Sequence, residues 1–211
     1  MRNHPRMLAI LLSTLGALLV VPPPVAAGVP DPLTRQHLLT LADYESVYPT
    51  LRQPSRIVLR SPVFAPRGCD DQELVVRGAT RILGSLSTSL RRRSVSLIDQ
   101  NLVRFDTVAQ ARSLVGRYRH FSKACVGDVR TDDGEGSRVR LKNRAWQPPH
   151  LGDQSAGMLI GWFSRGSASW RRVLAVRVGR TVSVIDVSFE DIRPPQAQVL
   201  DLGGLAVDHL G

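Results

Sequence analysis

The chain has 211 residues, 28 basic against 18 acidic side chains, and a formal net charge of +10. This length allows one domain with a sizeable hydrophobic core. Arginine supplies 26 of the basic residues, they are scattered along the chain, and aromatic residues make up only 5% of it. Nucleic-acid binders of the common types place aromatic stacking positions among their cations, so we exclude that class and predict a solvated basic surface.

The N-terminus has the pattern of a cleaved signal peptide. Arg2 and Arg6 precede an apolar run from Met7 to Val21, and a proline-rich break leads to small residues at the end of segment 1–27. The apolar run would form a helix of about 22 Å, short of the ~30 Å hydrocarbon core, which disfavours the alternative of a retained anchor. We predict a secreted single domain, residues 28–211, that is neither membrane-inserted nor a lipoprotein, because no cysteine lies near the cleavage site. Cleavage removes two arginines and no acid, which lowers the net charge to +8.

The first part of the mature chain is predicted to contain a short helix and an extended passage. Asp31, a good N-cap residue, is followed by proline, which predicts a helix over residues 32–42. Four prolines make residues 45–67 extended, with a strand over residues 56–59.

A second helix, a strand and a longer helix are predicted next. Acidic residues after Cys69 and apolar residues at helical spacing predict a helix over residues 69–83. Alternation and β-branched residues predict a strand over residues 93–105. The stretch from Asp106 to Cys125 predicts the longest helix. One face of it carries Val108, Ala111, Leu114, Val115, Tyr118, Phe121 and Cys125.

Cys125 can be a nucleophile or half of a disulfide. On a helix, His120 and Cys125 lie about 140° apart around the axis, so they cannot form a catalytic pair. In an exported protein two cysteines usually pair. We therefore predict a disulfide between Cys69 and Cys125, which closes a 57-residue loop and stabilises the fold by about 4 kcal/mol in the chain-entropy model.

The rest of the chain is predicted to be an antiparallel meander followed by a helix. The strands are expected at residues 137–146, 156–164, 170–179 and 181–190. A two-residue turn at Gly179-Arg180 pairs Val178 with Thr181 and Trp170 with Phe189. The opposite face of this hairpin is so apolar that another element is expected to cover part of it. A helix is expected over residues 195–202, with Gly203-Gly204 weakening its continuation. These elements predict an α+β fold, an antiparallel sheet packed with about two to four helices.

Three stretches resemble the extracellular sensor-domain family named after the mycobacterial PknH receptor kinase. They are LLTLADY (38–44), VSLIDQNLVRFDTVAQARSLVGRYRHFSKACVGD (95–128) and VLAVRVGRTVSVIDVSFED (173–191), and the likeness covers residues 30–209. The resemblance implies an actinobacterial secreted α+β domain with helices around an antiparallel sheet, two disulfides and a cleft for an unidentified ligand. No kinase region is present, so signalling through a kinase is not implied.

The cysteines match that family in part. Cys69 and Cys125 correspond to the family's cysteines before and at the end of the main helix. The family's second pair is absent, and Trp170 and Phe189 stand close to its positions. An aromatic pair in place of that disulfide would contribute about 0.5–1.5 kcal/mol beyond burial.

The motifs of common enzymes are not found. GDQSAG (152–157) is one residue too long for a nucleophile elbow, and Ser155, His150 and Asp153 are too close in sequence to form a triad without long-range partners. The acidic stretch 128–136 lacks the ligand spacing of a calcium loop and is interpreted as a turn. We predict no catalytic residue, no metal and no cofactor. A hydrolase acting on envelope substrates remains the alternative.

The predicted function is that of a monomeric, non-catalytic domain that binds an unknown ligand or protein of the cell envelope. A cleft is expected between the main helix and the meander, lined by residues from 146–166. Trp146, Trp162 and Arg165 are the candidate ligand contacts, because exposed aromatic and arginine side chains favour recognition. Both tryptophans could equally belong to the core, and a polyanion-binding protein is a further alternative.

Overall fold

The computed structural model describes one compact unit, Pro32–Gly211. Within it, the described residues are 33–50, 52–59, 64–69, 73–76, 79–90, 94–132, 138–164 and 166–211. The predicted signal peptide lies outside these residues. In the part that is described, no helix is both long and apolar enough to cross a membrane.

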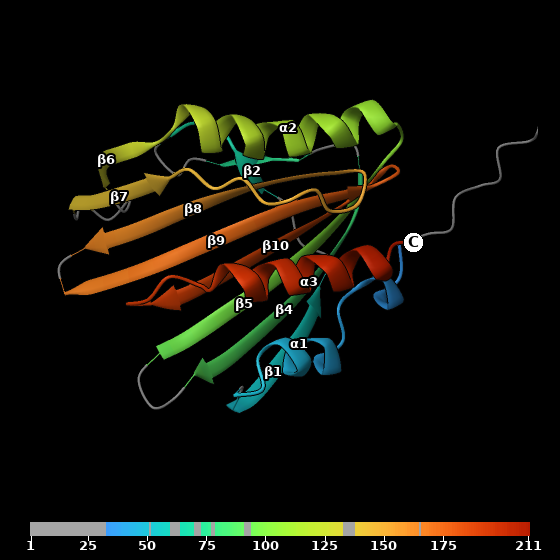
Figure 1. Ribbon diagram of the computed structural model, residues 1–211, viewed down its shortest axis with the longest axis horizontal. Helices are drawn as coiled ribbons and strands as arrows, with labels where there is room; N and C mark the ends of the chain where they lie inside the picture. The colour runs from blue at the N-terminus through green and yellow to red at the C-terminus, as the bar shows by residue number, and fades with distance from the viewer. Residues whose placement is uncertain are drawn as a thin grey trace, which may run out of the picture. The chain divides into compact units, whose positions relative to one another are not determined.

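Eight strands of the described chain form one antiparallel sheet (Figure 1). Its order is β1-β4-β5-β10-β9-β8-β7-β6, and a separate hairpin is formed by β2 and β3. The bounds are β1 Arg52–Leu59, β2 Phe64–Pro66, β3 Glu73–Val75, β4 Ala79–Leu90, β5 Ser94–Phe105, β6 Gly127–Asp132, β7 Arg138–Arg144, β8 Gln154–Ser164, β9 Ser167–Val178 and β10 Thr181–Glu190. The predicted α+β class with an antiparallel meander is confirmed.

The predicted register of the β9–β10 hairpin is confirmed along its whole length. Thr181 pairs with Val178 and Phe189 pairs with Trp170. The two rings nevertheless take other partners, since Phe189 meets Tyr48 edge to face at 6.0 Å and Trp170 meets Phe163 at 5.6 Å. Trp170, Phe189 and Tyr48 are buried in one cluster, and Phe163 packs against it.

Helix α2, Val108–Ala124, covers the second, apolar face of the β9–β10 hairpin, for which the sequence predicted a covering element. Thr107 caps it: its hydroxyl accepts a hydrogen bond from the backbone N–H of Gln110, whose side chain accepts one from the Thr107 backbone. The helix contributes to one core cluster with the sheet. The members include Ala111, Leu114, Val115, Tyr118, Phe121 and Cys125 from the predicted stripe, and Val173, Ala175, Val182 and Val184 from the sheet. Val108 is the exception, because it lies exposed in the first turn.

Helices α1, Leu41–Val47, and α3, Gln196–Asp208, pack on the other face of the sheet. Their contacts in β9 and β10 are the side chains that alternate with those beneath α2. In Figure 1, α2 lies above the strands and α3 in front of them.

The predicted bounds of two helices need correction. The N-terminal helix expected over 32–42 begins only at Leu41, because Thr40 caps it, and is preceded by the short 3-10 helix Arg35–His37.

The C-terminal helix continues past its predicted end at residue 202. Gly203 lies within this helix, and a Cβ placed there would come within 2.5 Å of Leu174 Cδ2 and 3.0 Å of Leu151 Cδ1. The glycine therefore allows close contact between α3 and β9, which outweighs its low helix propensity.

Two further predictions were wrong in the type of element. The segment predicted as a helix over 69–83 contains β3 and the start of β4, because β4 pairs with β5 over twelve residue pairs. The segment interpreted as an acidic turn, 128–136, contains most of β6, whose residues alternate between half-buried and exposed at the edge of the sheet. Pairing with β7 decides this conformation.

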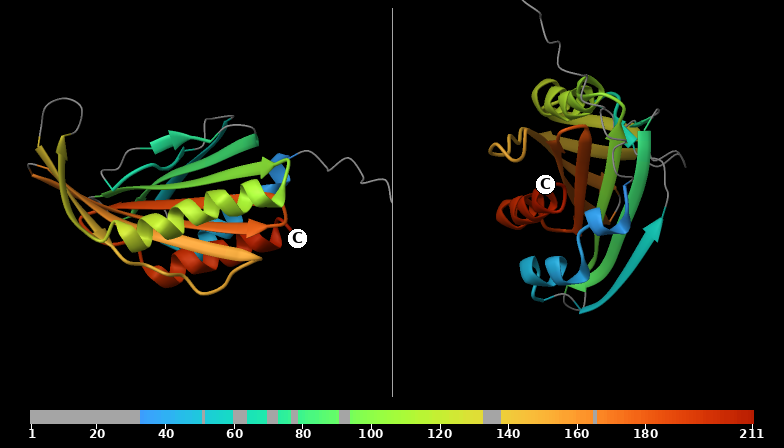
Figure 2. Two further views of the ribbon diagram at one scale, coloured as in Figure 1. Left: turned by 90° about the horizontal axis from the view of Figure 1, so that it is seen from above. Right: turned by 90° about the vertical axis from the view of Figure 1, so that its right-hand side faces the viewer.

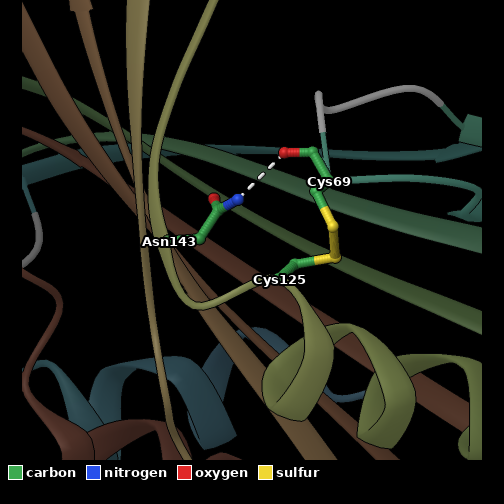
Figure 3. The surroundings of a disulfide bond; sticks show 3 residues. All are labelled: Cys69, Cys125 and Asn143. Atoms are coloured by element: carbon green, nitrogen blue, oxygen red, sulfur yellow. Dashed lines mark hydrogen bonds between the residues drawn. A yellow bond between two sulfur atoms is a disulfide. The ribbon is translucent and has the colours of Figure 1, made fainter.

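The predicted disulfide between Cys69 and Cys125 is present (Figure 3). It joins the segment after β2 to the end of α2, and no free cysteine occurs in the described chain. The side chain of Asn143 in β7 donates a hydrogen bond of 2.9 Å to the carbonyl oxygen of Cys69. Three elements are thus connected at one point.

Asp43 connects α1 to the end of α3. Its Oδ2 accepts hydrogen bonds from the Thr40 backbone N–H at 2.6 Å and the Thr40 hydroxyl at 2.7 Å, and it lies 3.0 Å from Nε2 of His209. Partial burial acts to raise the pKa of Asp43. The hydrogen bonds from Thr40 and the interaction with His209 outweigh it, and the pKa lies below its ordinary value of 3.8.

The lowered pKa predicts acid-dependent stability. The carboxylate contributes fully above the unfolded-state pKa, and its contribution is lost as the pH falls through the lower folded-state value. We therefore expect Asp43→Asn to lower the free energy of unfolding at about pH 5, and the difference from wild type to shrink below about pH 4. Urea unfolding at a series of pH values checks this, with the exposed Asp208→Asn as the control for the loss of one carboxylate. A difference that persists undiminished into strong acid would contradict it.

Candidate functional site

A cleft of about 580 Å³ lies between α2 and the chain that leads into β8. Residues from α2, the loop 145–153, the first residues of β8 and one residue of β9 line it. In Figure 1 and in the right panel of Figure 2, this loop runs between α2 and α3. The cleft is thus formed by segments far apart in sequence.

The loop is held on both sides of the cleft by side-chain hydrogen bonds. The hydroxyl of Ser122 on α2 donates to the carbonyl oxygen of Trp146 at 2.9 Å and accepts from its backbone N–H at 3.0 Å. Across the cleft, the hydroxyl of Ser155 donates to the Pro149 carbonyl at 2.7 Å and accepts from the Leu151 N–H at 3.3 Å. The shape of the cleft is therefore fixed before any ligand enters.

The end of the loop is fastened to β9. The backbone N–H of Asp153 donates to the carbonyl of Arg177 at 2.8 Å, and the carboxylate of Asp153 lies 2.9 Å from the Arg177 guanidinium. That carboxylate also accepts from the backbone N–H of Gly179 at 2.8 Å. Gly152 has φ +56°, and a Cβ there would lie 2.6 Å from the Arg177 carbonyl oxygen, so only glycine fits this approach.

The cleft carries an excess of positive charge. Arg112, Arg119 and Lys123 line it from α2, and Arg177 lines it from β9. The spacing of seven and four residues places the three α2 cations on one side of the helix. Asp153 is the one acidic residue among the lining side chains, and its charge is balanced by Arg177.

Trp146 is at once a core residue and a wall of the cleft. It is 6% exposed and lines the cleft, while its ring lies 4.6 Å from the guanidinium carbon of Arg172 and its edge faces Gly157. Burial, together with the nearby charge of Arg193, lowers the pKa of Arg172. The close contacts with Arg172 and Gly157 fix the orientation of the indole.

Of the other two predicted ligand contacts, one lies away from the cleft and one is outside the described residues. Trp162 is half-buried and packs against the core cluster beneath α2, and it is not among the residues that line the cleft. Arg165 lies outside the described residues. Of the two candidates that the structure describes, Trp146 lines the cleft and Trp162 does not.

The residues of the hydrolase alternative, His150, Asp153 and Ser155, all line the cleft but are not linked to one another. The Ser155 hydroxyl donates to a backbone carbonyl, and the Asp153 carboxylate is occupied by Arg177 and Gly179. His150 is exposed in the loop. A nucleophile needs a base within hydrogen-bond reach and a group that orients the base, and this arrangement offers neither.

A second hollow of about 480 Å³ lies on another side of α2, next to the disulfide. Arg67, Arg117 and His120 line it together with both cysteines. Over the described part of the chain, no three His, Cys, Asp or Glu side chains are grouped to hold a metal ion.

These features define the chain as a disulfide-linked antiparallel α+β domain with a preformed, basic cleft. Among solved structures, the extracellular domain of PknH from Mycobacterium tuberculosis is similar to it. That match has a TM-score of 0.57 and 14% sequence identity, and it covers 84% of this chain and 96% of the other. The chain has the fold of that domain. No family model matches the sequence, and no curated protein matches it.

Sequence reasoning missed the cations of the cleft. Arg112, Arg119 and Lys123 could have been found, because their spacing sets them on one helix side, opposite much of the apolar stripe. Arg177 gave no such signal, since its contact with the first residues of β8 depends on long-range pairing.

Proposed function

We propose that this protein is a secreted, non-catalytic binding domain that holds a small ligand of the cell envelope in the cleft between α2 and residues 146–157. The observation that carries the proposal is the cleft itself, preformed and about 580 Å³ in volume. Sites for small organic molecules commonly have volumes of about 300–1,000 Å³. Trp146 and the cationic side chains of α2 are the proposed ligand contacts, and the protein acts as a monomer.

Three further observations support this proposal. The fold is similar to that of the PknH extracellular domain. The disulfide favours an oxidising compartment, which agrees with export through the N-terminal segment. Ser155 and Asp153 are engaged in holding the walls of the cleft, as expected for a binding site rather than for a reactive one.

A cleft-filling variant tests the proposal. Gln147 is exposed and lines the cleft, so Gln147→Trp fills the entrance without a change of charge. We expect the wild-type protein, incubated with a cell-envelope extract and analysed by native mass spectrometry, to carry a bound small molecule. The variant is expected to lose it, because the added indole occupies the ligand's space.

The control carries the same substitution away from the cleft. Gln196 is exposed at the start of α3 and is not part of the cleft, so Gln196→Trp is expected to retain the bound molecule. Retention by Gln147→Trp, or equal loss from both variants, would contradict binding in the cleft.

A further inference from the structure

Five hydrogen-bond acceptors in the walls of the cleft are already occupied. The carbonyl oxygen of Ser155 accepts from Arg119 Nη2 at 3.2 Å, and the Asp153 carboxylate accepts from Arg177. The side-chain oxygen of Gln154 accepts from Arg177 Nε at 3.4 Å. On the loop side, the carbonyls of Trp146 and Pro149 accept from serine hydroxyls.

The donors are in excess. With the residues that the structure describes, Arg112 and Lys123 form no hydrogen bond or ion pair, and Arg119 makes a single bond to Ser155. A guanidinium has five N–H groups and an ammonium has three. A ligand that satisfies this wall must therefore supply acceptors, and an anionic ligand supplies them most strongly.

The arrangement of the cations favours an oxyanion. Arg119 and Lys123 are one helical turn apart, about 6 Å along the axis, so one phosphate-sized group can contact both. Arginine binds phosphate oxygens in a bidentate manner, and lysine adds a point charge. The single carboxylate in the lining does not repel an anion strongly, because Arg177 and the Gly179 N–H neutralise it.

The remaining wall is suited to an uncharged part of the same molecule. Trp146 and Pro148 line the cleft beside the polar groups, and the volume far exceeds that of a bare ion. We propose that the ligand is a small organic molecule with a phosphate group, held by Arg119 and Lys123, and an apolar or ring-shaped part that lies against Trp146 and Pro148. This inference rests on the proposed function and names the ligand chemistry of the same cleft.

Phenyl phosphate is a probe with both features, and phenol lacks the phosphate. By titration calorimetry, we expect saturable binding of phenyl phosphate and none of phenol at the same concentrations. Arg119→Gln/Lys123→Gln is expected to weaken binding at least about tenfold, since the loss of even one charge-assisted hydrogen bond costs that much. The matched control, Arg117→Gln/Arg130→Gln, removes two exposed cations outside the cleft and is expected to bind as wild type.

A vesicle assay separates the two sources of a phosphate group. Binding to phosphatidylglycerol vesicles but not to phosphatidylcholine vesicles, abolished in Arg119→Gln/Lys123→Gln, supports a lipid headgroup. Binding of phenyl phosphate without vesicle binding supports a soluble phosphate compound. Absence of binding to either probe, or equal weakening in the control variant, overturns the inference. If either of these results is obtained while Gln147→Trp still loses the envelope molecule, the cleft binds a ligand of another chemistry and the proposed function stands.

Discussion

Removal of the disulfide in Cys69→Ala/Cys125→Ala is expected to lower the free energy of unfolding by about 4 kcal/mol, the chain-entropy value for a loop of this length. The bond closes a loop with a sequence separation of 56 residues. That loop includes β3, β4, β5 and α2, so without the bond the unfolded chain gains the conformational freedom of this whole segment. A typical domain is stable by only about 5–15 kcal/mol, so the effect is large.

Urea unfolding of the wild type and the double variant measures this difference. Wild-type protein treated with a reducing agent is expected to lose a similar amount, while the double variant is expected to be insensitive to the reductant. A loss below about 1 kcal/mol in the double variant would show that the fold is held without the bond and would refute the chain-entropy estimate.

Gly152→Ala is expected to destabilise the protein by clearly more than Gly179→Ala, although both glycines have φ +56°. At Gly179 nothing lies within 4 Å of the added Cβ, so only the left-handed backbone is penalised, by about 1–2 kcal/mol. At Gly152 the Cβ would lie 2.6 Å from the Arg177 carbonyl oxygen, a backbone atom that cannot move alone. The loop must then shift away from β9.

The pair of variants separates backbone strain from steric conflict. We expect Gly152→Ala to cost at least about 1 kcal/mol more than Gly179→Ala by urea unfolding, within the range for overpacking. It should also weaken ligand retention, because Asp153 next to it lines the cleft. Equal destabilisation by both variants would mean that the loop is not held against β9 as the structure shows.

The sequence predicted correctly those elements whose conformation is determined by residues close together in the chain. The two-residue turn at Gly179-Arg180 fixed the hairpin register, and the apolar stripe of α2 was identified because its spacing is purely helical. The prediction failed where contacts between residues far apart in the sequence determine the secondary structure. Leu74, Val75 and Ala79 fit a helical face, but pairing of β3 with β2 and of β4 with β5 makes the region extended.

The same distinction applies to the candidate site. Trp146 could be selected from the sequence as an aromatic residue between the main helix and the meander. The cleft around it depends on the contact of Ser122 with Trp146 and of Asp153 with Arg177, which are 24 residues apart in each case. Neither contact leaves a periodic signal in the sequence, so the way the loop closes the cleft against α2 and β9 became visible only in the structure.

An amide chemical-shift map, recorded while envelope extract is added to labelled protein, tests directly whether the cleft between α2 and residues 146–157 is the binding site. We expect the shifts to concentrate in residues 146–157 and in the part of α2 from Arg112 to Lys123. Shifts confined to the hollow beside the disulfide or to β6, with the cleft amides unchanged, would contradict it.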